Sequence, residues 1–197
     1  MCGYTKGSLD HNQNLGSEDA FLTRFDADGQ KAWTRQWGSR MTEYGLSVAT
    51  DDASNAFVTG YTYGSVEADA SHGGQDAFLS GFSRDGTALF NRQWGSVFDD
   101  NARSLTVLGT VLLVVGDTQG ALTGVLPSGG RDAFLSTYDT EGRSHWTEQW
   151  GQQGDDFALG VAAGSDGAVY VGGYRELPEE SGAGRARDAI LSKWLVE

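Results

Sequence analysis

Short apolar runs of strand length, separated by turns rich in Gly and Asp, follow one another along the whole chain. In the first copy of this pattern they predict strands over residues 19–25, 32–37, 46–49 and 57–61, because such runs between turn residues are typical of β-strands. The turn Asp26–Gly29 ends in a glycine, which accepts the positive φ that closes a hairpin. No segment keeps the period of an amphipathic helix. The pattern predicts an all-β protein.

Three markers return in one register along the chain, at steps of 57 and 56 residues. The first is the aspartate that opens Asp-Ala-(Phe/Ile)-Leu: Asp19, Asp76, Asp132 and Asp188. The second is the tryptophan of Gln-Trp-Gly: Trp37, Trp94 and Trp150. The third is the glycine before Tyr or Asp: Gly3, Gly60, Gly116 and Gly173. A strict repeat of this kind indicates stacked copies of one structural unit.

The strand that opens each copy is apolar on both of its faces. In the first copy, Ala20 and Leu22 point to one side, whereas Phe21 and Phe25 point to the other. A strand covered on both sides belongs to a small sheet between two similar sheets, as in a β-propeller. We therefore expect an all-β β-propeller of four-stranded antiparallel blades, with about 56 residues per blade.

The blade boundaries follow from the register of the repeat. A single propeller over residues 1–197 is expected to hold three complete blades and partial-blade strands at both ends. The complete blades are predicted near residues 19–63, 76–120 and 132–175. The partial-blade strands are predicted near residues 1–6 and 188–196. Because propellers usually need at least four blades to close, the predicted partner is a second copy of the chain, as a homo-oligomer, or the rest of a longer propeller chain.

Three segments carry the most distinctive residues of the repeat, namely Gly73–Leu79, Gln149–Gly151 with Asp155–Asp156 after it, and Gly60–Thr62. Through these residues the chain resembles the bacterial β-propeller repeat family known as SBBP repeats. The resemblance covers essentially the whole chain. It implies a propeller fold and a bacterial, extracellular or cell-surface location. It does not imply an enzymatic activity, because a fold does not fix a function.

Composition narrows the range of partners. The formal net charge of −13 argues against nucleic acid and against an anionic membrane surface, since both would repel the chain. Membrane insertion is not expected, because the longest dense apolar run, 111–115, is only strand-sized. Cys2 is the single cysteine, which excludes an intrachain disulfide. No signal peptide is expected at the start of the chain.

The repeated carboxylates could be ligands of ions, but a structural role is favoured, because an aspartate at a strand start readily accepts backbone N–H groups. The pairs Asp99–Asp100 and Asp155–Asp156, with Thr42–Glu43 in the same place, could act as acid and base or bind calcium. Turn caps are favoured there too. Asp26 and Asp28 are the weak alternative metal site, and the hairpin turn is preferred. We therefore expect no metal and no cofactor.

The aromatic and histidine positions favour structural roles as well. The repeated tryptophans are expected to pack between neighbouring blades, although on a sugar-binding propeller they could stack on sugar rings. The histidines do not follow the repeat, and no nucleophile elbow or phosphate loop occurs. The chain is therefore not expected to be an enzyme. A propeller hydrolase is the third hypothesis, with His145 or Asp155 as first candidates.

The loops between the fourth strand of one copy and the first strand of the next differ most between copies. Variable loops on a rigid scaffold are where binding residues gather, so we expect a binding face there. Its candidate ligand-binding residues are Tyr63, Glu67, His72, Arg131, Glu176 and Arg185. The expected function is a non-catalytic interaction or assembly scaffold. A carbohydrate-binding, lectin-like propeller with a glycan partner is the alternative.

Overall fold

The computed structural model describes residues 1–66, 71–177 and 186–195, which contain fourteen β-strands and no helix. No element in these ranges is therefore a helix that could cross a membrane. In chain order the strands are β1 (Cys2–Thr5), β2 (Asp19–Phe25), β3 (Lys31–Trp37), β4 (Glu43–Thr50), β5 (Ala56–Thr62), β6 (Asp76–Phe82), β7 (Ala88–Trp94), β8 (Asp100–Leu108), β9 (Val111–Thr118), β10 (Asp132–Asp139), β11 (Ser144–Trp150), β12 (Asp156–Ala163), β13 (Ala168–Glu176) and β14 (Arg187–Leu195).

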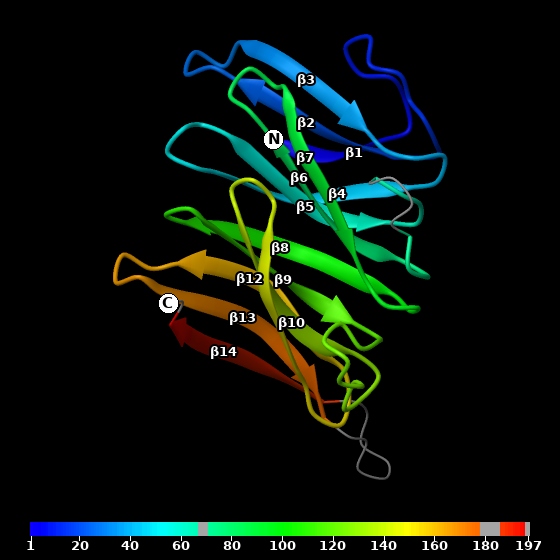
Figure 1. Ribbon diagram of the computed structural model, residues 1–197, viewed down its shortest axis with the longest axis vertical. Coiled ribbons are helices and arrows are strands. Elements are labelled where there is room, and N and C mark those ends of the chain that lie inside the picture. Colours follow the sequence, from blue (N-terminus) through cyan, green and yellow to red (C-terminus); the bar gives the residue numbers. More distant parts are fainter. Residues whose placement is uncertain (67–70, 178–185, 196–197) are drawn as a thin grey trace.

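The strands form four antiparallel sheets that are stacked in chain order (Figure 1). Sheet 1 is β1-β2-β3, sheet 2 is β4-β5-β6-β7, sheet 3 is β8-β9-β10-β11, and sheet 4 is β12-β13-β14. Each sheet packs against the next, and sheets 1 and 4 lie at opposite ends of the stack. The predicted all-β fold and the predicted strand positions are confirmed.

The grouping of strands into sheets differs from the predicted blades. Each predicted unit, 19–63, 76–120 and 132–175, gives its first two strands to one sheet and its last two strands to the next sheet. The described residues thus contain two four-stranded and two three-stranded sheets, where three complete blades and two end strands were expected. The reason is that the variable loops connect paired neighbours, such as β5 and β6, whereas the short loop after Gln-Trp-Gly crosses between sheets.

The hairpin turns form where the sequence places glycine after an acidic or hydroxyl residue. Gly29, Gly86 and Gly142 have φ angles of 75°, 83° and 79°, a conformation that glycine adopts without steric cost. In the first turn, Asp26 Oδ1 accepts the N–H groups of Asp28 at 3.0 Å and Gln30 at 2.8 Å. These residues therefore close a hairpin between β2 and β3.

The core lies between the sheets, in three apolar clusters. In the middle interface, the Trp94 ring of sheet 2 contacts Phe134 at 6.3 Å and Tyr138 at 5.2 Å in sheet 3, measured between ring centroids. The same contact recurs between sheets 1 and 2 and between sheets 3 and 4, through Trp37 with Phe82 and Trp150 with Trp194. The predicted packing of the tryptophans between neighbouring sheets is confirmed.

The two outer faces of the stack expose apolar side chains to solvent. β6 and β10 are covered on both faces, as expected, but the outer face of β2 is only partly covered, because no sheet of the described chain precedes sheet 1. Its Phe25 is 45% exposed. At the other end, Leu191 and Leu195 on β14 are 74% and 79% exposed. The stack therefore ends in two uncovered sheet faces.

Candidate functional site

The variable loops and the loops that link successive sheets lie together on one side of the stack, at the right of Figure 1. We call this side the loop face; it comprises the described parts of the loops after β1, β3, β5, β7, β9, β11 and β13. Backbone hydrogen bonds fasten the two kinds of loop together: Ser17 N–H donates to Met41 O at 2.8 Å, and Gln119 N–H donates to Asp99 O at 3.0 Å. The loop face is thus a surface held in place by the sheets.

The aspartate that opens each first strand anchors a variable loop. The Asp76 carboxylate is buried, and its Oδ2 accepts the backbone N–H of His72 at 2.8 Å and Gln93 Nε2 at 2.7 Å. Gln93 Oε1 accepts the N–H of Val66 in the same loop at 2.9 Å. Sheets 1 and 3 repeat this arrangement with Asp19 and Gln36, and with Asp132 and Gln149. The repeated Asp and Gln side chains therefore hold the loops.

A second carboxylate follows each Gln-Trp-Gly and caps the loop between sheets. Asp100 accepts the backbone N–H of Ser96 at 2.5 Å and its Oγ–H at 3.0 Å, and Glu43 accepts the N–H of Ser39 at 2.8 Å. Asp100 is fully buried, and this burial, together with the nearby charge of Asp76, raises the pKa of its carboxyl above the usual value.

The raised pKa of Asp100 gives a pH-dependent prediction. The folded state holds the proton of this carboxyl more tightly than the unfolded state, so its contribution to stability is present at low pH and lost as pH rises through the folded pKa. Asp100→Asn, which mimics the neutral acid and keeps an acceptor for Ser96, is expected to gain stability relative to the parent between pH 4 and pH 7. Urea denaturation across this range measures the difference.

The comparison variant for that experiment is Asp85→Asn. The Asp85 carboxylate is exposed, and a hydrogen bond from the Ser83 hydroxyl lowers its pKa. Its stabilising contribution is present above the unfolded pKa and is lost as pH falls, so Asp85→Asn is expected to lose stability at pH 7. If both variants gained stability, or both lost it, the raised pKa of Asp100 would not explain the effect of Asp100→Asn.

The four predicted binding residues that the structure describes do not form one cluster. Tyr63 is 44% exposed, and its hydroxyl accepts a hydrogen bond from Gln75 at 2.7 Å. His72 is exposed beside Asp76. Glu176 is buried and forms an ion pair of 2.7 Å with Arg187. Glu67 and Arg185 lie outside the described residues.

Arg131, the remaining candidate, belongs to a charged network in sheet 3. The Asp117 carboxylate is fully buried and contacts Arg131, and it accepts hydrogen bonds from Arg103 Nε at 2.6 Å and Asn101 Nδ2 at 3.2 Å. Arg131 also lies 3.5 Å from Asp99. Opposite charges thus neutralise the buried carboxylate, at the position where the other copies carry the tyrosine of Gly-Tyr.

A row of tyrosines leads to this network from sheets 1 and 2. The ring of Tyr44 lies 4.4 Å from Tyr4 and 4.9 Å from Tyr61, and Tyr61 lies 6.1 Å from Tyr63, all between centroids. Tyr4 is 51% exposed, and burial together with the neighbouring Tyr44 raises the pKa of Tyr61. Of these four only Tyr63 was predicted as a binding residue. The repeated Gly-Tyr motif contains Tyr4 and Tyr61. The sequence does not show that both lie near Tyr44, because that proximity depends on how the sheets pack.

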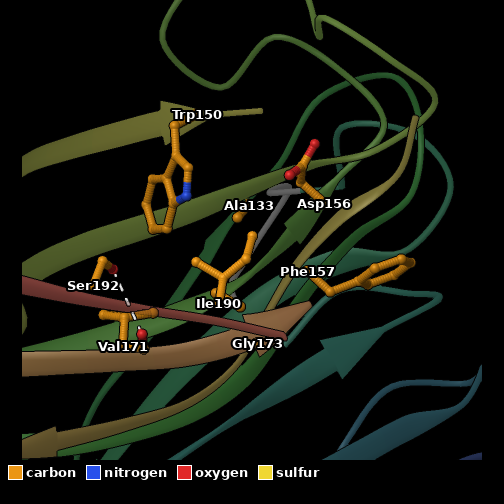
Figure 2. A pocket seen from close by; sticks show the side chains of 9 residues that line it. Ala133, Trp150, Asp156, Phe157, Val171, Gly173, Ile190 and Ser192 are labelled. Atoms are coloured by element: carbon orange, nitrogen blue, oxygen red, sulfur yellow. Dashed lines mark hydrogen bonds between the residues drawn. The ribbon is translucent and has the colours of Figure 1, made fainter. Parts of the chain in front are cut away.

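A small cavity lies between sheets 3 and 4, beside Trp150, Asp156 and Ile190 (Figure 2). Its volume of about 10 Å³ is at the lower limit for one water molecule, so it is a packing gap and not a ligand site. Ile190 pairs with Gly173 as Phe134 pairs with Gly116 in sheet 3. The smaller side chain leaves the gap.

Filling this gap is expected to stabilise the protein. In Ile190→Phe, the larger ring would occupy the position that Phe134 fills in sheet 3, and we expect a gain of about 1 kcal/mol in the free energy of unfolding. Leu126→Phe, at an exposed position on the loop face, is the control, for which no gain is expected. Chemical denaturation of both variants tests this, and an equal gain would show that the gap is not the cause.

A larger cleft, of about 310 Å³, lies between sheets 1 and 2 on the side opposite the loop face. Its lining includes Phe25, Trp33 and Thr50. Beside the cleft, β1 pairs with β2 as far as Leu22, whereas the corresponding pairing of β5 with β6 continues to Phe82.

The carboxylates and histidines predicted as alternative metal or catalytic groups lie in turns and at strand ends. In the part of the chain that the structure describes, no three His, Cys, Asp or Glu side chains are grouped so that they could hold a metal ion. Asp26 and Asp28 lie in the hairpin turn between β2 and β3. His145 lies at the start of β11, whereas Asp155 follows its end. The two hydrolase candidates therefore sit at opposite ends of one strand.

No protein-family model matches the chain. A curated relative, the Regulatory protein FlaEY of Caulobacter vibrioides, is 30% identical over 118 residues, which are 56% of this chain. The chain spans 12% of the length of that relative.

Proposed function

We propose that the protein is a non-catalytic interaction scaffold of the β-propeller type, which associates with further sheets of the same kind through its terminal sheets. The observation that carries this proposal is the inter-sheet packing, which repeats within the chain and leaves both ends uncovered. The contacts between sheets run largely through the first strands β4, β8 and β12, as expected for blades around an axis. The resemblance to SBBP repeats supports the same arrangement in a bacterial, extracellular or cell-surface protein.

Each internal interface joins two different kinds of sheet face. One kind carries the Ala and Leu of the third strand in the sheet, as Ala133 and Leu135 do in sheet 3. The other kind carries the aromatic residues of the next sheet, as Phe134 and Tyr138 do toward sheet 2. Sheet 4 exposes the first kind through Leu191, and sheet 1 exposes the second through Phe25. The two open faces are therefore complementary to each other.

Head-to-tail contact of two copies would repeat the internal interface. Such a contact joins different surfaces of the two partners, so it produces closed rings or open chains of copies. The C-terminal face of one copy would cover the N-terminal face of the next. A binding module of this kind is compatible with the description of the Caulobacter relative as a regulatory protein.

Native mass measured by light scattering tests the proposal. We expect at least twice the chain mass of 21.0 kDa, and we expect Leu191→Asp to return the mass to that of a single chain, because a charge would then face the partner's apolar surface. Leu126→Asp is the matched control, since Leu126 is 78% exposed on the loop face. A single-chain mass for the parent at all concentrations would overturn the proposal.

The tyrosine row supports a second function, the binding of glycans at the loop face. Half-exposed aromatic rings in a row offer flat surfaces on which sugar rings stack, and the adjacent Arg103 and Arg131 offer hydrogen-bond donors. Titration of the protein with oligosaccharides tests this function. Tyr44→Ala is expected to abolish binding, whereas Tyr170→Ala, on the opposite side of the stack, is expected to preserve it.

A further inference from the structure

The C-terminal strand β14 is an open edge strand of nine residues. It pairs with β13 along one side, and within the described ranges no strand pairs with its other side. In the other three sheets the strand in this position has a partner there: β3 pairs with β2, β7 with β6, and β11 with β10. An edge with unpaired N–H and C=O groups is a template for another strand.

The partner strands β3, β7 and β11 share one sequence pattern. Each reads aromatic, Thr or Asn, any residue, Gln, Trp, and each is followed by Gly. In all three sheets the tryptophan lies opposite an alanine and the glutamine donates to the aspartate that opens the neighbouring strand, as Trp150 faces Ala133 and Gln149 Nε2 donates to Asp132 at 3.2 Å. These contacts select which sequence pairs at this edge, and they also fix the register of the pairing.

In sheets 1 and 3 the middle of the pattern adds a polar contact. The hydroxyl groups of Ser136 and Thr147 lie 2.8 Å apart across the β10–β11 pair, and those of Thr23 and Thr34 lie 3.0 Å apart in sheet 1. A strand with an apolar residue in place of the threonine would leave the facing hydroxyl without this contact.

The β14 strand carries the same kinds of residue at the positions that the partner strands contact in the other sheets. Asp188, Ala189 and Ser192 occupy the places of Asp132, Ala133 and Ser136, because both strands pair in the same register with the preceding Gly-containing strand. Asp188 and Ala189 are exposed. The edge of β14 therefore presents the same kinds of side chain that β3, β7 and β11 contact in the other sheets.

We propose that β14 binds one antiparallel strand of the pattern aromatic-(Thr/Asn)-x-Gln-Trp-Gly, donated by a further copy of this repeat. Main-chain hydrogen bonds along the edge supply affinity, while the glutamine at Asp188 and the tryptophan over Ala189 and Leu191 supply specificity. This proposal rests on the proposed function, since it states how the three-stranded sheet 4 is completed by its partner.

The test uses a labelled peptide with the sequence of residues 144–151, Ser-His-Trp-Thr-Glu-Gln-Trp-Gly, titrated with the full chain and followed by fluorescence anisotropy. We expect saturable one-to-one binding. Replacement of the peptide's glutamine by alanine, or Asp188→Ala in the protein, is expected to weaken binding about tenfold, as the loss of a hydrogen bond to a charged group would. Asp52→Ala, at an exposed aspartate in the turn after β4, is the matched control and is expected to bind like the parent.

Three results would overturn the proposal: no saturation by the peptide, equal binding of a peptide with the same residues in scrambled order, or unchanged affinity of Asp188→Ala. Because Asp188 is exposed, its variant is expected to fold, which circular dichroism checks. The outcome is independent of the native mass. If the protein assembles through Leu191 but does not bind the peptide, only the face-to-face packing of the proposed function is supported. If the protein has the mass of a single chain but binds the peptide, only the site at the β14 edge is supported.

Discussion

Trp94→Ala is expected to lower the free energy of unfolding by about 4 kcal/mol, the range for removal of a large aromatic side chain from a core. Trp94 of sheet 2 packs against Phe134 and Tyr138 of sheet 3, in the middle interface of the stack. The cavity left by the ring would lie beside the apolar cluster that sheets 2 and 3 share, so the loss is also expected to reduce the cooperativity of unfolding. Urea denaturation, followed by far-UV circular dichroism, measures both effects.

Two further variants separate packing from hydrogen bonding. Trp94 Nε1 has no hydrogen-bond partner among the described residues, so Trp94→Phe, which keeps a ring, is expected to cost much less than alanine. Trp146→Ala is the matched control, because the Trp146 side chain is 39% exposed, and we expect it to cost about 1 kcal/mol. If the two alanine variants lost equal stability, packing between the sheets would not be the main cause of the loss.

Gly116→Ala is expected to destabilise the protein by about 3 kcal/mol, or roughly 6 to 12 °C in the thermal midpoint of a chain of this size. A Cβ at Gly116 would lie 1.8 Å from Asn101 O and 2.8 Å from the Phe134 ring. The carbonyl belongs to the backbone of β8 beside a bulge, so it cannot move without disturbing the β8–β9 pairing. Differential scanning calorimetry measures the change.

The control for this experiment is Gly172→Ala, in the equivalent strand of sheet 4. A Cβ there would meet no atom within 4 Å, because Gly172 lies on the open face opposite Leu191. Alanine restricts the unfolded chain more than glycine does, so a neutral effect or a small gain is expected. Equal losses at Gly116 and Gly172 would show that the cost reflects strand glycines in general and not the close approach of β8.

The candidate site was predictable only where it follows the repeat. The aspartates and the Gln-Trp-Gly motifs were visible in the sequence, and the structure places Asp76 and Gln93 together at a loop. The tyrosine row and the Asp117 network were not predicted as groups, because Tyr4 and Tyr44 lie in different sheets. Contacts between sheets depend on how separate copies stack, and no local pattern encodes that.

The sequence by itself determined the strands, the turns and the repeat. Strand length, the alternation of apolar residues and the glycines at Gly29, Gly86 and Gly142 act over a few neighbouring residues, so the pattern alone revealed them. Only the tertiary structure decided which strands share a sheet. The loop after Trp37 crosses to the next sheet, whereas the longer loop after β5 returns to its own, because long-range hydrogen bonds and aromatic packing between sheets select the partners.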